Sequence, residues 1–317
     1  MGNVGGNRNF GFGKQMAWAG AQALRDSYGD GHYATVAAHS ERWGQFANWA
    51  KATQEVRDAR DVSVETVFAY GETLAEQVRQ QTMSVAYAQN LLSSVNVVLA
   101  ALRGDRAIRI SPAKLVGERR HVRDIPPAGL DRTAVQQVVQ SLCAAGHEQV
   151  AAVVELARDL GLREREASML DARAALREAT SGGRVNITAG TKGGRGHHVD
   201  RWVPVSERAM DSLRRAASAQ GSSRNLIPAE LTWRAWNDHV HHIWAGARSR
   251  RGLEKLHDLR AAYACERYLA LTGQAAPVVA GRRLVDAHAD RQARITIAHE
   301  LGHARIDVVS AYIGGSR

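Results

Sequence analysis

The sequence contains little cysteine and little proline. Cys143 and Cys265 are the only cysteines among 317 residues, and there are six prolines. Two cysteines cannot form the disulfide framework that holds small secreted domains together, so a reducing, cytoplasmic compartment is expected. Hydrophobic residues make up 44% of the chain and charged residues 23%. With so few prolines, this composition argues against a disordered or fibrous chain.

The sequence also lacks a recognisable membrane signal. The stretch MGNVGGNRNFGFGK has no apolar signal core, and Gly6 stands where a myristoylation signal needs Ser or Thr. Residues 80–102 carry no formal charge and are long enough to cross a bilayer. Their apolar residues recur every four positions, however, and leave a polar face, so we expect a core helix of a soluble domain and no membrane partner. These apolar residues are Met83, Tyr87, Leu91, Val95 and Leu99.

Acidic residues are fewer than basic ones, 32 against 42, which leaves a net charge of +10. Such an excess favours a polyanionic partner, either nucleic acid or an anionic membrane surface. The excess is uneven along the chain. Residues 1–110 hold 11 basic and 10 acidic residues, whereas residues 111–317 hold 31 and 22. The basic surface is therefore expected mostly in the second part of the chain.

The length of the chain and the breaks in its pattern predict two domains. The first 14 residues, rich in Gly and Asn, are expected to form a flexible arm. A helical domain follows over residues 15–110, and the second domain covers residues 131–317. Between them, residues 111–130 hold three of the six prolines and a basic cluster, so we interpret them as a basic linker suited to lie across a phosphate backbone. The helical patterns of the first domain cover 14–28, 32–53, 63–79 and 83–102.

The second domain combines helical patterns with one short β-like segment. Within residues 184–205, the runs RVNITAG and VDRWVPV flank the turn TKGGRGHH, which predicts a hairpin. The sequence therefore predicts a mainly helical domain with one small sheet. Its helical patterns cover 132–145, 147–160, 206–219, 229–248, 257–272 and the last thirty residues.

Two motifs in the second domain pair unusual residue types with a suitable position. In GLREREASML, Arg163 and Glu166 lie three residues apart at a predicted helix start, so the carboxylate can hold the guanidinium on one helix face. Lys192 lies at the Gly-flanked tip of the TKGGR turn, in a chain with only five lysines beside 37 arginines. An ammonium gives up a proton near neutral pH when it is perturbed, whereas a guanidinium does not. Taken singly, a surface ion pair and an exposed loop lysine are the simpler interpretations.

Two further motifs lie toward the end of the chain. HDLRAAYAC places His257 and Arg260 on the same side of a helix, which pairs a titratable donor with a bidentate phosphate clamp. In LGHARIDVVSAYIGG, His303 precedes Tyr312 by nine residues. On its own, Tyr312 is most simply interpreted as a core tyrosine.

The order Arg, Lys, His-x-x-Arg, His and Tyr in these motifs resembles the tyrosine recombinases, the phage-type site-specific integrases. By motif the resemblance covers most of residues 130–317, whereas residues 14–102 resemble the family's SAM-like core-binding domain by architecture only. The resemblance implies a mainly α fold. A four-helix, DNA-binding N-terminal domain would precede a mixed, mostly helical catalytic domain with a small β-sheet hairpin.

The resemblance also implies roles for the matching residues. Arg163 and Arg260 would clamp the scissile phosphate and neutralise charge that develops on its oxygens. Tyr312 would attack phosphorus and give a 3′-phosphotyrosyl intermediate with a free 5′-hydroxyl. Lys192 would protonate the departing 5′-oxygen.

Supporting roles are implied for three more residues. His257 would assist proton transfer, His303 would hydrogen-bond the phosphate, and Glu166 would support the site from behind. Basic residues of the linker and of the turn would bind DNA, namely Arg119, Arg120, Arg123 and Arg195.

The resemblance further implies partners and a source of energy. No metal or nucleotide cofactor would be needed, because the phosphotyrosine conserves the bond energy for rejoining the strands. The partner would be double-stranded DNA at specific recombination sites, bound by a homo-tetramer with accessory DNA-bending proteins, as for the recombinase of a mobile genetic element.

The sequence departs from the family pattern at two places. Arg260 and His303 are 43 residues apart, more than such proteins usually have, and VVAGRRLVDAHADRQAR within residues 270–295 has the character of an insertion. The helix that commonly follows the tyrosine and docks onto a neighbouring subunit is also missing, so either assembly uses another surface or the sequence is truncated.

Two other functions remain open at this point. The run HELGH, from His299 to His303, matches the HExxH pattern of zinc metalloproteases, in which two histidines bind zinc and the glutamate is the base. Such enzymes need a third protein ligand, for which only Asp307 follows His303. The second alternative is a catalytically inactive DNA-binding protein of the same fold.

Overall fold

A computed structural model describes residues 7–316 and all of their side chains except that of His197. The chain divides into two compact units, Met1–Arg120 and His121–Arg317. Each unit has its own hydrophobic core of buried residues. The boundary therefore lies between residues 120 and 121, inside the segment 111–130 that the sequence predicts as a linker.

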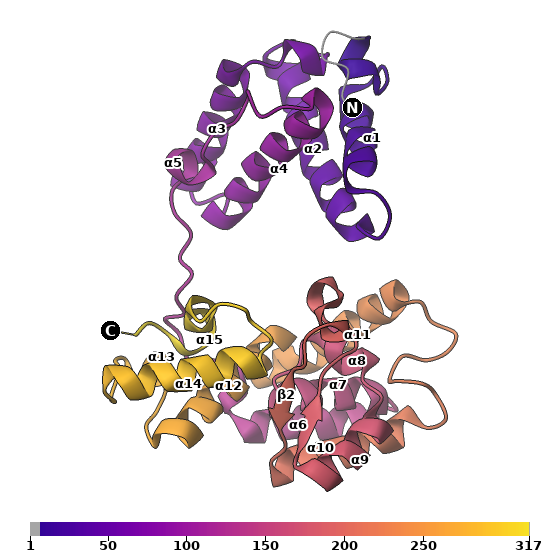
Figure 1. The fold of residues 1–317 in the computed structure, drawn as a ribbon, viewed down its shortest axis with the longest axis vertical. Helices are drawn as coiled ribbons and strands as arrows, with labels where there is room; N and C mark the ends of the chain where they lie inside the picture. Colours follow the sequence, from indigo (N-terminus) through magenta and orange to yellow (C-terminus); the bar gives the residue numbers. More distant parts are fainter. Residues whose placement is uncertain (1–6, 317) are drawn as a thin grey trace. The chain divides into compact units, whose positions relative to one another are not determined.

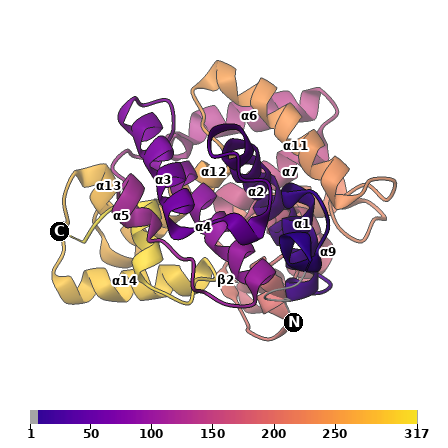
Figure 2. The same ribbon diagram turned by 90° about the horizontal axis from the view of Figure 1, so that it is seen from above.

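The first unit is a helical domain, as the sequence predicts. Helices α1, α2 and α4 pack against one another, α3 packs against α2 and α4, and the short α5 packs against α3 and α4 (Figures 1 and 2). The ends of α1 to α4 agree with the four predicted ranges to within a few residues, whereas α5 forms inside the predicted linker. The five helices are α1 (Met16–Tyr28), α2 (Tyr33–Thr53), α3 (Val64–Arg79), α4 (Val85–Arg103) and α5 (Pro112–Val116).

The centre of this unit is the fully buried ring of Trp43 in α2. Its indole N–H donates to the carbonyl of Met16 over 2.8 Å. Gly20 in α1 allows the ring this close, because a Cβ atom at that position would lie 2.2 Å from the indole nitrogen. The absent side chain therefore lets α1 and α2 pack tightly.

Helix α4 contains the uncharged run of the sequence analysis. By length and composition it is the one helix of residues 7–316 that is apolar enough to cross a membrane. Its stripe residues Leu91, Val95 and Leu99 are fully buried, and α4 contacts α1, α2 and α3. It thus lies in the core of the first unit, as the periodicity predicts.

The predicted flexible arm over residues 1–14 is corrected for its second half, while residues 1–6 lie outside the described part. Asn9 and Phe10 are buried in the short 3-10 helix Arg8–Gly11. The Asn9 carboxamide accepts from the amide of Ala59 over 2.7 Å, and the Asn9 amide donates to Asp58 over 2.9 Å. Polar side chains therefore fasten this stretch to a segment fifty residues away, which local composition did not indicate.

The second unit is mostly helical and contains one small sheet, in agreement with the predicted fold class. Strands β1 (Arg184–Asn186) and β2 (Trp202–Pro204) pair antiparallel with Val185 opposite Val203. The connection between them is a long loop with a 3-10 segment, Lys192–His197, instead of a tight turn. The helices are α6 (Arg132–Ala144), α7 (Glu148–Asp159), α8 (Glu164–Met169), α9 (Ala172–Gly182), α10 (Glu207–Gln220), α11 (Trp233–Arg248), α12 (Leu256–Thr272), α13 (Pro277–Ala280), α14 (Ala287–Glu300) and α15 (Ser310–Ile313).

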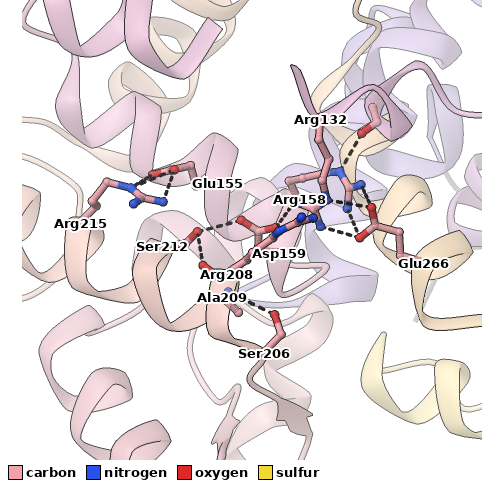
Figure 3. A network of polar contacts seen from close by, with 11 residues as sticks. Arg132, Glu155, Arg158, Asp159, Ser206, Arg208, Ala209, Ser212, Arg215 and Glu266 are labelled. Atoms are coloured by element: carbon pink, nitrogen blue, oxygen red, sulfur yellow. Dashed lines mark hydrogen bonds and ion pairs between the residues drawn. The ribbon is translucent and has the colours of Figure 1, made fainter. Parts of the chain in front are cut away.

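Helix α12 lies at the centre of the second unit and contacts α7, α14 and α15. A polar network holds it to α6 and α7 (Figure 3). The buried guanidinium of Arg158 donates to the carbonyl of Gly129 over 2.7 Å and pairs with Glu266 of α12. Arg132 bridges Glu266 and Asp159, at 2.5 and 2.8 Å from the two carboxylates. Arg158 is buried and Arg132 and Glu266 are about one-third exposed, and their pairing fixes the position of the helix that carries the HDLR motif.

Candidate active site

Arg163 and Glu166 form the interaction that their spacing predicts. Arg163 is the residue before α8, and its guanidinium lies 2.5 Å from the Glu166 carboxylate. Its backbone N–H also donates to Glu166 over 2.8 Å, which satisfies an amide at the start of the helix. Glu166 is fully buried, whereas 26% of the Arg163 side chain is exposed. The carboxylate therefore holds a guanidinium whose outer part remains accessible.

Three guanidinium groups surround the Glu166 carboxylate. Besides Arg163, Arg201 lies 2.8 Å and Arg260 3.6 Å from it. Burial alone would raise the pKa of Glu166, but the charges of Arg201, Arg260 and Arg163 outweigh it and lower the pKa to about 2. Glu166 is therefore ionised at neutral pH and offsets part of the positive charge of the site.

Arg260 lies on α12 and is fully buried. Its guanidinium donates to the carbonyl oxygens of Gly161 and Leu301. Within the described part of the chain, the Nε atom of this side chain has no hydrogen-bond partner. The ring of Tyr312 lies over the guanidinium, 5.7 Å from its centroid. Burial lowers the pKa of Arg260 to about 10, so the group remains charged at neutral pH.

Tyr312 lies in α15 with 4% of its surface exposed. Its hydroxyl is 3.1 Å from Nε2 of His303, which in turn is 3.5 Å from the guanidinium of Arg260. The ring of His257 is 5.3 Å away, centroid to centroid. The structure thus brings together four of the residues that the motifs identify, from α12, from the turn after α14 and from α15.

Both imidazoles of this group have lowered pKa values, so their cationic forms are disfavoured. Burial and the charges of Arg260, Arg163 and Arg201 lower the pKa of His303 to about 3. Enclosure by the surrounding chain, together with Arg260 and Arg163, also lowers the pKa of His257, although its surface is partly exposed. At neutral pH the His303 ring is therefore neutral, and Nε2 can accept a hydrogen bond from the Tyr312 hydroxyl.

Lys192 reaches the same site from the loop between the two strands. A cavity of about 970 Å³ is lined by Arg163, Lys192, His303 and Tyr312. Lys192 is exposed at the start of the 3-10 segment, as the glycine-flanked turn predicts. This cavity is large enough for a phosphodiester and gathers positive side chains around the tyrosine.

Arg201 is a residue of the site that sequence reasoning missed. It immediately precedes strand β2, is buried, pairs with Glu166 and donates from Nε to the carbonyl of Glu300 over 2.7 Å. An arginine between two β-like runs carries no motif, so only the pairing of β1 with β2 and the packing on α14 reveal its position. Arg201 links the sheet to the carboxylate that holds Arg163.

The predicted DNA-binding arginines differ in their surroundings. Arg119 donates to Gln89 over 2.7 Å and also contacts Asn90 in the first unit. Arg123 contacts the carboxylate of Asp258, and its amide donates to the carbonyl of Ser310 over 2.9 Å. These two side chains fasten the segment to the unit in which each lies. Arg120 and Arg195 are exposed, and Arg195 lines the cavity.

The HExxH interpretation of residues 299–303 is wrong. Helix α14 ends at Glu300, so the second histidine lies beyond the helix, where it contacts Tyr312. The Glu300 carboxylate is buried, lies 2.6 Å from Arg267 and accepts from the Tyr263 hydroxyl over 2.8 Å. Over residues 7–316, no group of three or more His, Cys, Asp or Glu side chains is arranged to hold a metal ion. The Glu300 carboxylate therefore makes structural contacts and is not placed to act as the base of a metalloprotease.

Comparison with known proteins finds a family model that matches part of the chain. Residues 117–266 match the family model described as "Integrase". This range contains Arg163, Lys192, His257 and Arg260 and ends before Tyr312. No curated protein matches the chain. Among solved structures, the crystal structure of XerA recombinase is similar over 95% of this chain and 94% of that one, with 15% identity and a TM-score of 0.39, too low to carry an argument.

Proposed function

Because residues 117–266 match the family model described as "Integrase", we propose that this chain is a tyrosine-type, site-specific DNA recombinase. It would cleave and rejoin DNA strands through a covalent 3′-phosphotyrosyl intermediate on Tyr312. The observation that carries the proposal is the arrangement around this phenol, with His303 at 3.1 Å and a guanidinium under the ring. A core tyrosine without function would not need these polar neighbours.

The positive groups supply what phosphoryl transfer requires. A scissile phosphate in the cavity would contact the exposed part of the Arg163 guanidinium, which Glu166 holds in place. The ring of Tyr312 covers Arg260, so the phosphate would reach this second guanidinium only after the ring moves aside. Fixed donors on both sides would then stabilise the negative charge that develops on the non-bridging oxygens.

Proton transfer follows from the remaining residues. The Tyr312 oxygen would bond to phosphorus while the bond to the 5′-oxygen breaks, and Lys192 would donate the proton that this oxygen takes up. The negative phosphate would offset the arginine charges that lower the pKa of His303 and His257. Both imidazoles would thus become better proton acceptors when DNA is bound, and His303, which is hydrogen-bonded to the phenol, would take up the proton that Tyr312 loses.

The partner in this proposal is duplex DNA. The charge excess of residues 111–317 suits a phosphate backbone, and the exposed Arg120 and Arg195 are the predicted contacts whose side chains face solvent. Assembly into a tetramer on the recombination site, with help from DNA-bending proteins, and function in the cytoplasm complete the proposal.

The experiment that tests this function traps the covalent intermediate. The full chain is incubated with a pool of nicked duplexes whose core sequence is randomised. The nick lets the short 5′-hydroxyl strand diffuse away after cleavage. Adducts that survive denaturant are recovered, their DNA is sequenced and the linked tyrosine is identified by mass spectrometry. An adduct on Tyr312 supports the proposal. Binding of the pool without any adduct favours the alternative, an inactive DNA-binding protein of the same fold.

A further inference from the structure

A buried arginine on α14 contacts both ends of the helix that carries Tyr312. The guanidinium of Arg294 donates to the Ser310 hydroxyl over 3.2 Å, at the first residue of α15. It also donates to the carbonyl oxygens of Gly314 and Gly315, over 3.1 and 3.0 Å, just beyond the last residue of α15. Only 4% of Arg294 is exposed. One rigid group therefore spans the four-residue helix.

The guanidinium is itself held in place from the opposite side. Its Nε atom donates to Asp290, one turn earlier on α14, over 2.9 Å. Asp290 also accepts from the hydroxyl of Tyr268 on α12 over 2.8 Å. Arg294, Asp290 and Tyr268 thus form a buried chain of polar contacts from the central helix to the end of the protein. We call these three residues the α15 clamp.

The segment after α15 is also packed closely against its surroundings. Gly314 has a φ of +88°, and a Cβ atom there would lie 2.7 Å from the backbone nitrogen of Val278 in α13. Arg283 donates to the carbonyl of Ser316 over 3.0 Å. Figures 1 and 2 both show the yellow end of the chain beside α13 and α14. The contacts come from residues 270–295, the apparent insertion, which the family motifs do not explain.

We propose that Arg294 is the positioning residue for the nucleophile, and this inference rests on the proposed function of Tyr312. A helix of four residues does not hold its shape by itself. Packing on α12 contributes to its orientation, and Arg294 holds both of its ends. Since a displacement of about 1 Å costs on the order of 100-fold in rate, the clamp decides whether the phenol can attack.

The test begins with a variant that keeps charge but loses the fork. Arg294→Lys retains a cation beside Asp290, but a point donor cannot reach the Ser310 hydroxyl and two carbonyls together. Arg294→Gln removes the charge as well. The matched control is Arg158→Gln, because Arg158 is equally buried and also bonds a carbonyl and a carboxylate, yet contacts no residue of 310–316. All variants are made in the full chain.

The first readout is hydrogen exchange of the amides in residues 310–316. Arg294→Lys is expected to raise their exchange rates at least tenfold above wild type, while Arg158→Gln leaves the ratio of their rates to those of the α12 amides unchanged. If Arg294→Gln does not fold, Ser310→Ala provides the second variant, since it removes one of the three contacts and leaves the Arg294–Asp290 pair intact. Unchanged exchange of residues 310–316 in both Arg294→Lys and Ser310→Ala would overturn the clamp.

The second readout separates positioning from general stability. On the randomised nicked pool, Arg294→Lys is expected to form the Tyr312 adduct at least tenfold more slowly at saturating DNA, with an apparent Kd within twofold of wild type. A merely structural role predicts instead that Lys rescues both the rate and the exchange. Equal loss of rate in Arg294→Lys and Arg158→Gln would also contradict the proposal.

These outcomes remain distinct from a failure of the proposed function. If the wild-type chain forms no adduct, the recombinase proposal fails, and a positioning role for a nucleophile fails with it. Hydrogen exchange would still show whether Arg294 orders α15. If wild type forms the adduct and Arg294→Lys matches it, only the further inference is lost.

Discussion

The Tyr312 hydroxyl lies 3.1 Å from Nε2 of His303, although Tyr312 belongs to α15 and His303 to the turn after α14. Because the pKa of His303 is lowered to about 3 by burial and by neighbouring arginines, the imidazole is neutral and Nε2 can accept this hydrogen bond. The contact fixes the direction of the phenolic oxygen before any substrate is present.

The first prediction concerns the nucleophile. Tyr312→Phe is expected to abolish the covalent DNA adduct, because the attacking oxygen is gone, while the ring still packs over Arg260. Loss of one hydrogen bond should lower the free energy of unfolding by only about 1 kcal/mol. Adduct formation on the nicked pool and the apparent Kd for duplex DNA are the measurements.

The matched control for this variant is Tyr263→Phe. Tyr263 is also buried, and its hydroxyl donates to Glu300, so the same atom is removed from a tyrosine outside the cavity. The adduct should persist in this control. An undiminished adduct in Tyr312→Phe would mean that another residue is the nucleophile.

The second prediction distinguishes Arg163 from Arg260, the two arginines proposed to bind the scissile phosphate. Arg163→Ala and Arg260→Ala should each slow cleavage by about 100- to 1,000-fold, as when a fixed donor to a developing charge is removed. Only Arg260→Ala should also lower the free energy of unfolding, by about 3–5 kcal/mol. This change breaks buried contacts with two loop carbonyls and leaves Glu166 with less charge compensation. Urea unfolding and single-turnover cleavage measure the two effects. Near-normal cleavage by Arg260→Lys would argue against a bidentate clamp.

The parts of the fold that the sequence predicts are those encoded by local periodicity. The four long helices of the first unit and the stripe of α4 follow from apolar spacing alone. The change of period predicts the two paired strands, although a long loop connects them. Arg163 and Glu166 were also predictable, since a capping interaction depends on residues three apart. In each case the determining contacts lie within one element or one turn.

The remaining features depend on contacts between distant segments. Phe10 is buried because Asn9 bonds a loop fifty residues later, although composition indicates a flexible arm. Arg123 resembles a linker cation but contacts Asp258, more than a hundred residues away. The HELGH run matches a zinc motif, but α14 ends at Glu300, so its two histidines do not lie on one helix face. No spacing rule contains this information.

The third prediction concerns acid stability. The pKa of Glu166 lies near 2 in the folded chain and near 4.5 in its ordinary state. The folded state thus binds fewer protons between these values, and the carboxylate contributes stability that is present above pH 4.5 and lost as the pH falls toward 2. At 1.36 kcal/mol per pKa unit, the contribution at neutral pH is about 3 kcal/mol.

Glu166→Gln should therefore be less stable than wild type at neutral pH, and the difference should shrink as the pH falls from about 4.5 to about 2. Urea midpoints of both proteins across this range provide the measurement. Because the low pKa of His303 affects both proteins in the same direction, it largely cancels in the difference. A gap that stays constant down to pH 2 would contradict the lowered pKa.

The fourth prediction concerns the two units. A fragment of residues 121–317 should fold, since the boundary lies at 120 and Arg123 and Gly129 are already bonded to α12. A fragment that begins at 131 should be less stable, because it loses these contacts. The longer fragment is expected to bind duplex DNA weakly, with steep salt dependence and little site preference. Binding as tight and selective as that of the full chain would show that the first unit has no part in DNA recognition.

The last prediction concerns Lys192 as the general acid. Its ammonium is exposed on the loop between β1 and β2 and lines the cavity that contains Tyr312. If its proton serves only to expel the 5′-oxygen, Lys192→Ala should cleave an ordinary phosphodiester about 100- to 10,000-fold more slowly than wild type. The substrate is a duplex sequence recovered from the nicked pool, and the rate is measured in a single turnover.

A 5′-bridging phosphorothiolate separates proton donation from phosphate binding. Its sulfur leaving group needs no proton, so this substrate should restore most of the rate that Lys192→Ala loses. The matched control is Arg163→Ala, which the phosphorothiolate should not rescue, because Arg163 acts on non-bridging oxygens and is held for that purpose by Glu166. Equal failure of Lys192→Ala on both substrates would make Lys192 a phosphate-binding residue. The proton would then have to come from His257, whose ring lies 5.3 Å from that of Tyr312 and whose pKa an incoming phosphate would raise.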